Sequence, residues 1–132
     1  MRRNPTVLGI DRGSKYIGLA YMTLQDRVPL PIGYIFNDKM TYISIADMII
    51  RYQVNTIVIG RPSQQKDIQT KIQQFVDGLW LLVDPETVKI EYIEEDYSSV
   101  QAGEIVSSFK KNVAEDTISA MILLDRWSGK SI

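Results

Sequence analysis

The spacing of hydrophobic residues in the first third of the chain predicts three short β-strands. Thr6–Ile10 is a continuous run of apolar and β-branched residues that ends at a turn over residues 11–14. A second run, Tyr16–Tyr21, follows so closely that the pair is expected to form an antiparallel hairpin. Ile32–Phe36 comes after two prolines, which fit an edge strand or a strand start better than the centre of a sheet.

Beyond residue 40 the pattern alternates between helical and extended periods. A first amphipathic helix is predicted by apolar side chains at helical spacing, at Tyr42, Ile45, Ala46, Ile49 and Ile50. Thr56–Ile59 is a continuous apolar run, typical of a strand that is covered on both faces, and it ends at Gly60-Arg61-Pro62. Val88–Ile93 is predicted as a further strand. Between these two strands, a second helix is indicated by Ile68, Ile72, Phe75, Val76 and Leu79.

The last third of the chain predicts two more helices. Ser98-Ser99-Val100-Gln101 has the form of a capping box that opens a helix. Residues 113–127 are apolar on most sides, so the final helix is expected to be largely buried. A hairpin followed by alternating helices and strands predicts an α/β fold, with a mixed sheet of about five strands flanked by helices. The 132 residues are expected to form one domain.

Composition narrows the chemistry that such a domain can perform. The chain has no His and no Cys, which excludes Ser-His-Asp and Cys-His nucleophiles, the usual zinc ligand sets and disulfides. Its net charge of −1 excludes a dominant basic field. No segment resembles a signal peptide, and the longest apolar run, Leu79–Val83, is too short to span a membrane. We therefore expect a cytoplasmic protein without a membrane partner.

Acidic residues occur at three positions where the local pattern is otherwise apolar. Asp11 ends a buried strand, and Glu94, Glu95 and Asp96 crowd the end of another. Asp116 precedes a stripe at helical spacing formed by Ala120, Leu123, Leu124 and Trp127. Because the carboxyl ends of parallel strands gather at one edge of an α/β sheet, these acids are expected to lie close together. Strand alternation leaves open whether Glu94 or Glu95 joins the cluster.

Clustered carboxylates predict a site for hard divalent cations. Three such groups repel one another unless a cation neutralises them, and oxygen ligands without His or Cys suit Mg²⁺ or Mn²⁺. A pair of these ions is a standard arrangement for phosphodiester hydrolysis. Each acid also has an ordinary explanation, as a turn residue, a solvated loop or a favourable charge at a helix start. These explanations treat the acids one at a time and do not account for their common placement.

Four blocks of sequence, spread over nearly the whole chain, carry recognisable motifs. They are Leu8-Gly9-Ile10-Asp11-Arg12-Gly13-Ser14-Lys15-Tyr16-Ile17-Gly18-Leu19-Ala20, Ile57-Val58-Ile59-Gly60-Arg61-Pro62, Glu94-Glu95-Asp96-Tyr97-Ser98-Ser99-Val100-Gln101-Ala102 and Glu115-Asp116-Thr117-Ile118-Ser119-Ala120-Met121-Ile122-Leu123-Leu124. The four blocks resemble the YqgF family, which is associated with Holliday junction resolution and has an RNase H-like fold, and they occur in that family's order. Together the blocks are more specific than any one alone.

The resemblance implies a nuclease with three carboxylates and two Mg²⁺ or Mn²⁺ ions. Carried over by position, the catalytic metal ligands are Asp11, Glu95 and Asp116. Family members are associated with four-way DNA junctions and with maturation of the 5′ end of pre-16S rRNA, so the implied partner is nucleic acid of either kind, bound by a monomer or homodimer. The candidate substrate-binding residues are Lys15, Ser98, Ser99, Lys110 and Lys111.

The chain also departs from the family pattern. Asp96 and Tyr16 stand where the family commonly has Arg, which removes two cations from the side expected to bind substrate. These changes keep open a second hypothesis, a catalytically weak or inactive RNase H-like domain that binds RNA or a protein partner. A third, an actin-like phosphotransferase fragment, rests on Asp11-Arg12-Gly13-Ser14 alone, and such enzymes need two domains to enclose a nucleotide.

Overall fold

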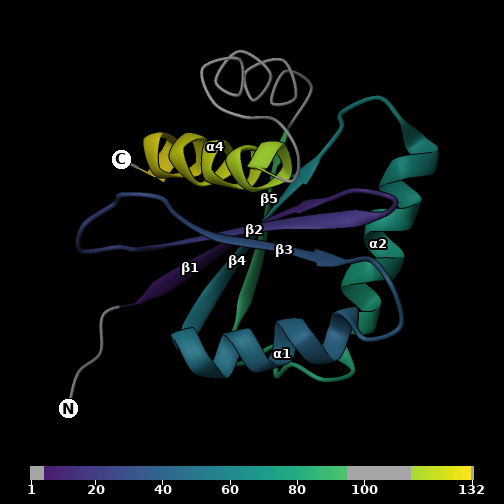
Figure 1. Cartoon of the computed structure of the whole chain (residues 1–132), viewed down its shortest axis with the longest axis horizontal. Coiled ribbons are helices and arrows are strands. Elements are labelled where there is room, and N and C mark those ends of the chain that lie inside the picture. Colours follow the sequence, from purple (N-terminus) through teal and green to yellow (C-terminus); the bar gives the residue numbers. More distant parts are fainter. Residues whose placement is uncertain (1–4, 95–113, 132) are drawn as a thin grey trace.

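The computed structural model describes residues 5–94 and 114–131, which contain one mixed sheet of five strands. The strand order is β3-β2-β1-β4-β5 (Figure 1). The bounds are Thr6–Arg12 for β1, Tyr16–Thr23 for β2, Leu30–Phe36 for β3, Val54–Arg61 for β4 and Lys89–Glu94 for β5. The predicted antiparallel hairpin of β1 and β2 and the predicted edge position of β3 are confirmed.

Strand directions bring chain segments that are distant in sequence to one edge of the sheet. Strands β1, β4 and β5 run parallel to one another, and β2 runs antiparallel to both β1 and β3. The carboxyl ends of β1, β3, β4 and β5 therefore share an edge with the start of β2. This carboxyl edge is where open α/β sheets bind ligands.

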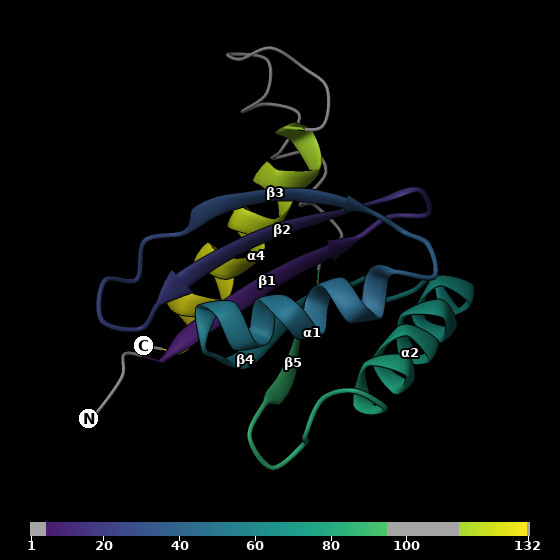
Figure 2. The same cartoon turned by 60° about the horizontal axis from the view of Figure 1, so that its bottom comes forward.

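Helices cover both faces of the sheet within the described ranges. Figures 1 and 2 show α1 (Thr41–Tyr52) and α2 (Lys66–Trp80) on one face and α4 (Ala114–Ser131) on the other. We call these the α2 face and the α4 face. None of the helices in the described segments combines the length and the apolar character needed to cross a membrane.

The alternation of side chains along each strand divides the core into two clusters. In β1, Leu8 and Ile10 belong to the cluster on the α2 face, whereas Val7 belongs to the cluster under α4. In β4, Ile57 and Ile59 likewise face α2 and Val58 faces α4. Because β4 is buried on both faces, its continuous apolar run is confirmed as the signature of an inner parallel strand.

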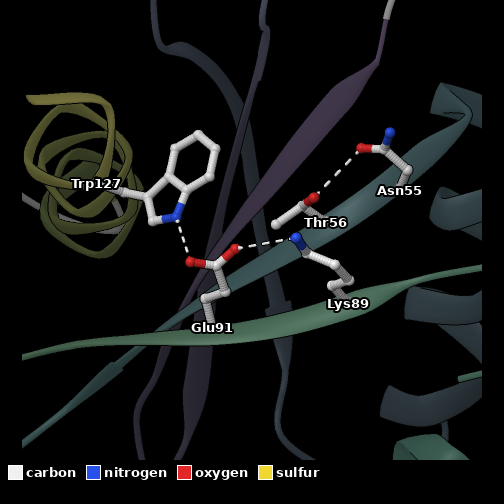
Figure 3. Close-up of polar contacts among 5 residues, drawn as sticks. All are labelled: Asn55, Thr56, Lys89, Glu91 and Trp127. Carbon is white, nitrogen blue, oxygen red and sulfur yellow. Dashed lines mark hydrogen bonds and ion pairs between the residues drawn. The ribbon is translucent and has the colours of Figure 1, made fainter. Parts of the chain in front are cut away.

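Helix α4 is anchored to the sheet near both of its ends. The Thr117 hydroxyl donates a hydrogen bond of 2.9 Å to the Gly33 carbonyl oxygen in β3. Near the other end, Trp127 Nε1 donates to Glu91 Oε1 in β5 at 3.0 Å, as Figure 3 shows. The second Glu91 oxygen lies 3.9 Å from Lys89 Nζ. These contacts fix the position of α4 along and across the sheet.

Two details of the sequence interpretation change, and one prediction has no described residues. Ile50, predicted on the apolar stripe of the first helix, is 78% exposed, because α1 turns mainly Thr41 and Ile45 toward the core. Strand β1 continues through Asp11 to Arg12, where a turn had been predicted to begin at residue 11. The helix predicted to open at Ser98 lies outside the described residues.

Candidate nuclease site at the carboxyl edge of the sheet

Asp11 lies at the carboxyl edge of the sheet, on the α4 face. It pairs with Gly18 in β2, and two residues earlier Gly9 pairs with Ala20. Ala20 belongs to the cluster under α4. Since positions two apart on a strand share a face and direct antiparallel partners do too, Asp11 is on the same side of the sheet as α4.

Close packing of α4 on β1 brings the start of this helix toward Asp11. A Cβ atom at Gly9 would lie 2.7 Å from Leu124 Cγ and 2.9 Å from the Ala120 carbonyl oxygen, so glycine is what permits this approach. Position 116 lies one helical turn before Ala120, on the same face of α4. The predicted stripe is confirmed for its described members, since Ala120, Leu123, Leu124 and Trp127 are all buried.

Glu94 lies on the opposite face from Asp11. It ends β5 beside Arg61 and follows Tyr92, which packs against the cluster on the α2 face. Ile93, by contrast, belongs to the cluster under α4. Strand β4 lies between β1 and β5, so Asp11 and the end of β5 share the carboxyl edge of the sheet but are on strands that are not adjacent.

Part of the predicted site lies outside the described residues. This applies to Glu95, Ser98, Ser99, Lys110 and Lys111. For Asp116 the structure gives only the position of its backbone in α4. Among the side chains that the structure describes, no group of three His, Cys, Asp or Glu could hold a metal ion, and Asp11 is the one member of the predicted triad in that set.

Lys15 is presented by the turn between β1 and β2 at the same edge. The Asn37 side chain donates a 2.9 Å hydrogen bond to the Gly13 carbonyl oxygen, and the Asn37 N–H donates to the Lys15 carbonyl oxygen, also at 2.9 Å. The Gly13 N–H donates to the Tyr16 carbonyl oxygen within the turn. The predicted phosphate-binding lysine therefore extends from a firmly bonded turn beside Asp11.

The other face of this edge holds a polar hollow that sequence reasoning did not identify. Arg61, Lys66, Gln69 and Tyr92 contribute to the lining of a pocket of about 290 Å³ between β4, β5 and α2. The Arg61 guanidinium carbon lies 5.2 Å from the centroid of the Tyr92 ring. Burial raises the pKa of Tyr92, while the positive charge of Arg61 opposes the rise and Asp77 adds to it. Arg61 had been interpreted only as part of the strand end.

The strand order, the hairpin of β1 and β2 and the acid at the end of β1 together define an RNase H-like protein. Solved structures support this fold. The T. thermophilus RuvC in complex with a Holliday junction substrate aligns with a TM-score of 0.63 and 10% identity, covering 96% of this chain and 95% of RuvC. The Fowlpox virus resolvase bound to Holliday junction DNA aligns with a TM-score of 0.60 and 14% identity, over 96% of this chain and 99% of the resolvase.

Sequence comparison identifies the family within this class. The profile of RuvX, described as Holliday junction resolvase, matches residues 5–128, and the chain belongs to this family. The family is the one that the motifs resembled under the name YqgF. A relative from Sulfurihydrogenibium, named as a candidate pre-16S rRNA nuclease, is 30% identical over 92% of this chain and 88% of its own length. A relative of the same name from Chlamydia trachomatis serovar L2 is 31% identical over 93% of this chain and 90% of its own length.

Proposed function

We propose that this protein is a metal-dependent nuclease that hydrolyses phosphodiester bonds in structured nucleic acid. The observation that carries the proposal is the position of Asp11. It lies at the carboxyl edge of an RNase H-like sheet, on the face where α4 packs against Gly9 and brings position 116 toward the same edge. Family membership over residues 5–128 supports the same activity.

We assign Asp11, Glu95 and Asp116 as the carboxylates of the site. Strand alternation supports Glu95 over Glu94, because Glu94 is on the α2 face and Ile93 is on the α4 face. Glu95 itself is carried over from the family pattern. The assignment of Asp116 rests on its helical spacing from Ala120, which lies against Gly9.

These three side chains fit a pair of divalent cations, for which we propose Mg²⁺ or Mn²⁺. Carboxylate oxygens are the hard ligands that both ions prefer, and the chain offers no His or Cys as an alternative. If the three carboxylates hold such ions, the chemistry supplied there would be a bound water of lowered pKa and neutralisation of the charge that develops on the phosphate. The protein supplies the fixed geometry, since β1 and α4 are locked together by the packing at Gly9.

Substrate contacts are assigned to the residues around this site. Lys15 extends from the bonded turn beside Asp11 and provides a cation for a backbone phosphate. Ser98, Ser99, Lys110 and Lys111 are proposed as further contacts on the basis of the family resemblance. We place the activity in the cytoplasm and in a single domain of this chain.

The relatives support two substrates for the same chemistry. Relatives about 30% identical to the chain carry a pre-16S rRNA nuclease name, whereas the solved structures bound to Holliday junctions are 10% and 14% identical. We therefore propose a ribosomal RNA precursor as the first substrate to test and a four-way DNA junction as the second. Neither substrate alters the role assigned to Asp11.

A paired cleavage assay tests the function. Wild type, Asp11→Asn and Asp26→Asn are incubated with each substrate in Mg²⁺ or Mn²⁺. We expect cleavage by wild type and a loss of at least about a hundredfold in Asp11→Asn, because the ligand acts on the charged transition state. Asp26 is an exposed carboxylate in the loop after β2, at the opposite edge of the sheet, and serves as the matched control. Equal rates for wild type and Asp11→Asn would refute the assignment, and binding without cleavage by wild type would favour a non-catalytic domain.

A further inference from the structure

Three aromatic side chains gather at the carboxyl edge, on the face that carries Asp11. Tyr16 begins β2 and pairs with Phe36 in β3, and Tyr34 pairs with Gly18. Gly18 is also the partner of Asp11 on the other side of β2. Because direct antiparallel partners share a face, Asp11, Tyr16, Tyr34 and Phe36 are all on the α4 face. We call the three rings the aromatic platform.

The rings of the aromatic platform contact one another and remain partly open to solvent. Their centroids are separated by 5.3 Å for Tyr16 and Tyr34, 5.4 Å for Tyr16 and Phe36, and 5.8 Å for Tyr34 and Phe36. Phe36 is 54% exposed and Tyr34 is 37% exposed. Lys15 Nζ lies 5.4 Å from the centroid of the Tyr16 ring. A cluster of exposed aromatic rings with an adjacent cation is a typical surface for a ligand that has both flat rings and negative charge.

A local irregularity of β3 places the rings on this face. The register shifts between Leu19 and Ala20 of β2, where β3 contains Gly33 at a φ of 134°. Ile32 and Ile35 consequently pack on the α2 face although they are three positions apart. The irregularity leaves Tyr34 and Phe36 on the opposite face, where α4 begins. Thr117 of α4 binds the Gly33 carbonyl oxygen and so fixes this geometry.

The aromatic platform lies within nucleotide reach of the proposed catalytic carboxylate. Asp11, Gly18 and Tyr34 form one row across β1, β2 and β3. The row spans two strand spacings, which is about 10 Å. Gly18 has no side chain, so no side chain from β2 stands between Asp11 and Tyr34 in this row. One or two nucleotides are long enough to connect a phosphate at Asp11 with a base at Tyr34.

We propose that the aromatic platform stacks unpaired bases of the nucleic-acid strand that is cleaved at Asp11, with Lys15 contacting a phosphate of the same strand. The link between the stacked bases and cleavage at Asp11 rests on the proposed nuclease function, whereas the binding of bases to the platform does not. Stacking tolerates any base and needs little positive charge, which agrees with a net charge of −1. Tyr16, which stands where the family commonly has Arg, therefore contributes a ring surface where a cation is absent.

Binding of a single-stranded oligonucleotide that contains 2-aminopurine tests the proposal. Affinity is measured in EDTA, so that binding is separated from cleavage, and quenching of 2-aminopurine reports stacking. We expect Phe36→Ala and Tyr34→Ala each to weaken binding about tenfold and to reduce quenching. Phe36→Tyr should retain both signals, and Phe36→Leu should lose quenching although it keeps an apolar side chain. Ile50→Ala, at an exposed apolar position on the far face, is the matched control.

The outcomes separate this proposal from the proposed function. Unchanged affinity and quenching in Phe36→Ala and Tyr34→Ala would overturn the aromatic platform, even if Asp11→Asn abolishes cleavage. A loss of quenching in a protein that never cleaves would support the platform and refute the nuclease assignment. If the substitutions alter only the sedimentation coefficient, the rings serve contact between copies of the chain and base stacking is wrong. Circular dichroism and thermal melting of each variant establish that it is folded.

Discussion

The absence of a side chain at Gly9 allows α4 to pack closely on β1, and the substitution Gly9→Ala tests whether this close packing is needed. The added methyl group would meet Leu124 Cγ at 2.7 Å and the Ala120 carbonyl oxygen at 2.9 Å. Leu124 lies in a close-packed cluster, which leaves its side chain little room to change rotamer. The Ala120 carbonyl oxygen belongs to the helix backbone and cannot move without the helix. We therefore expect α4 to move away from β1.

The expected cost follows from two opposing effects. Overpacking of a well-filled core costs about 1–3 kcal/mol. Replacing glycine by alanine within a strand returns roughly 0.5–1 kcal/mol, because the unfolded chain loses conformational freedom. The net loss of unfolding free energy is then at most about 2.5 kcal/mol, with a central value of about 1 kcal/mol, which corresponds to a fall in Tm on the order of 5 °C for a domain of this size. The shift of α4 also moves position 116 away from Asp11, so kcat should fall more than stability alone requires.

Urea denaturation, thermal melting and the cleavage assay below the melting transition measure these effects. Gly129→Ala is the matched control, because a Cβ at Gly129 in α4 meets no atom within 4 Å. It should be neutral or stabilise the protein by up to about 1 kcal/mol, as alanine does in a helix. Wild-type stability and wild-type kcat in Gly9→Ala would refute the argument that this contact sets the geometry of the site.

Three further substitutions test the anchoring and the electrostatics of the described residues. Trp127→Phe removes the donor to Glu91 and should lower the unfolding free energy by about 1 kcal/mol in urea titrations, whereas an unchanged midpoint would show that this contact does not anchor α4. Lys15→Gln should raise KM several-fold, leave kcat near wild type and reduce the salt dependence of binding; a selective loss of kcat would contradict a phosphate-binding role. The raised pKa of Tyr92 means that the unfolded phenol, at about 10, ionises before the folded one, so stability is lost as pH rises beyond 10. Tyr92→Phe should reduce that alkaline loss, and an identical pH profile in urea titrations would contradict it.

Much of the sheet could be predicted from the sequence because its signals are local. The close succession of two apolar runs predicts the hairpin of β1 and β2, and a continuous apolar run predicts that β4 is covered on both faces. The stripe that contains Ala120 and Leu124 predicts which side of α4 is buried. In each case neighbouring positions in the chain carry the periodicity, so no long-range contact is needed to interpret it.

The features that escaped prediction depend on partners far away in the sequence. Ile50 has the spacing of a buried residue but is exposed, because the angle at which α1 rests on the sheet decides which part of its apolar stripe is covered. The irregularity at Gly33 changes which residues of β3 share a face, and simple alternation cannot show this. The face of the sheet on which Glu94 and Arg61 lie could be assigned only once the pairing of β4 with β5 was known.

Anomalous diffraction from crystals grown with Mn²⁺ is the most direct test of the central claim, that carboxylates from β1, α4 and residue 95 hold the ions of a nuclease site. We predict Mn²⁺ bound to the carboxylate of Asp11 and to those of Glu95 and Asp116, with two ions about 3.5–4 Å apart once substrate is bound. Crystals of Asp11→Asn should lose at least one of the peaks. Mn²⁺ that binds elsewhere, or that binds equally in wild type and Asp11→Asn, would contradict the account.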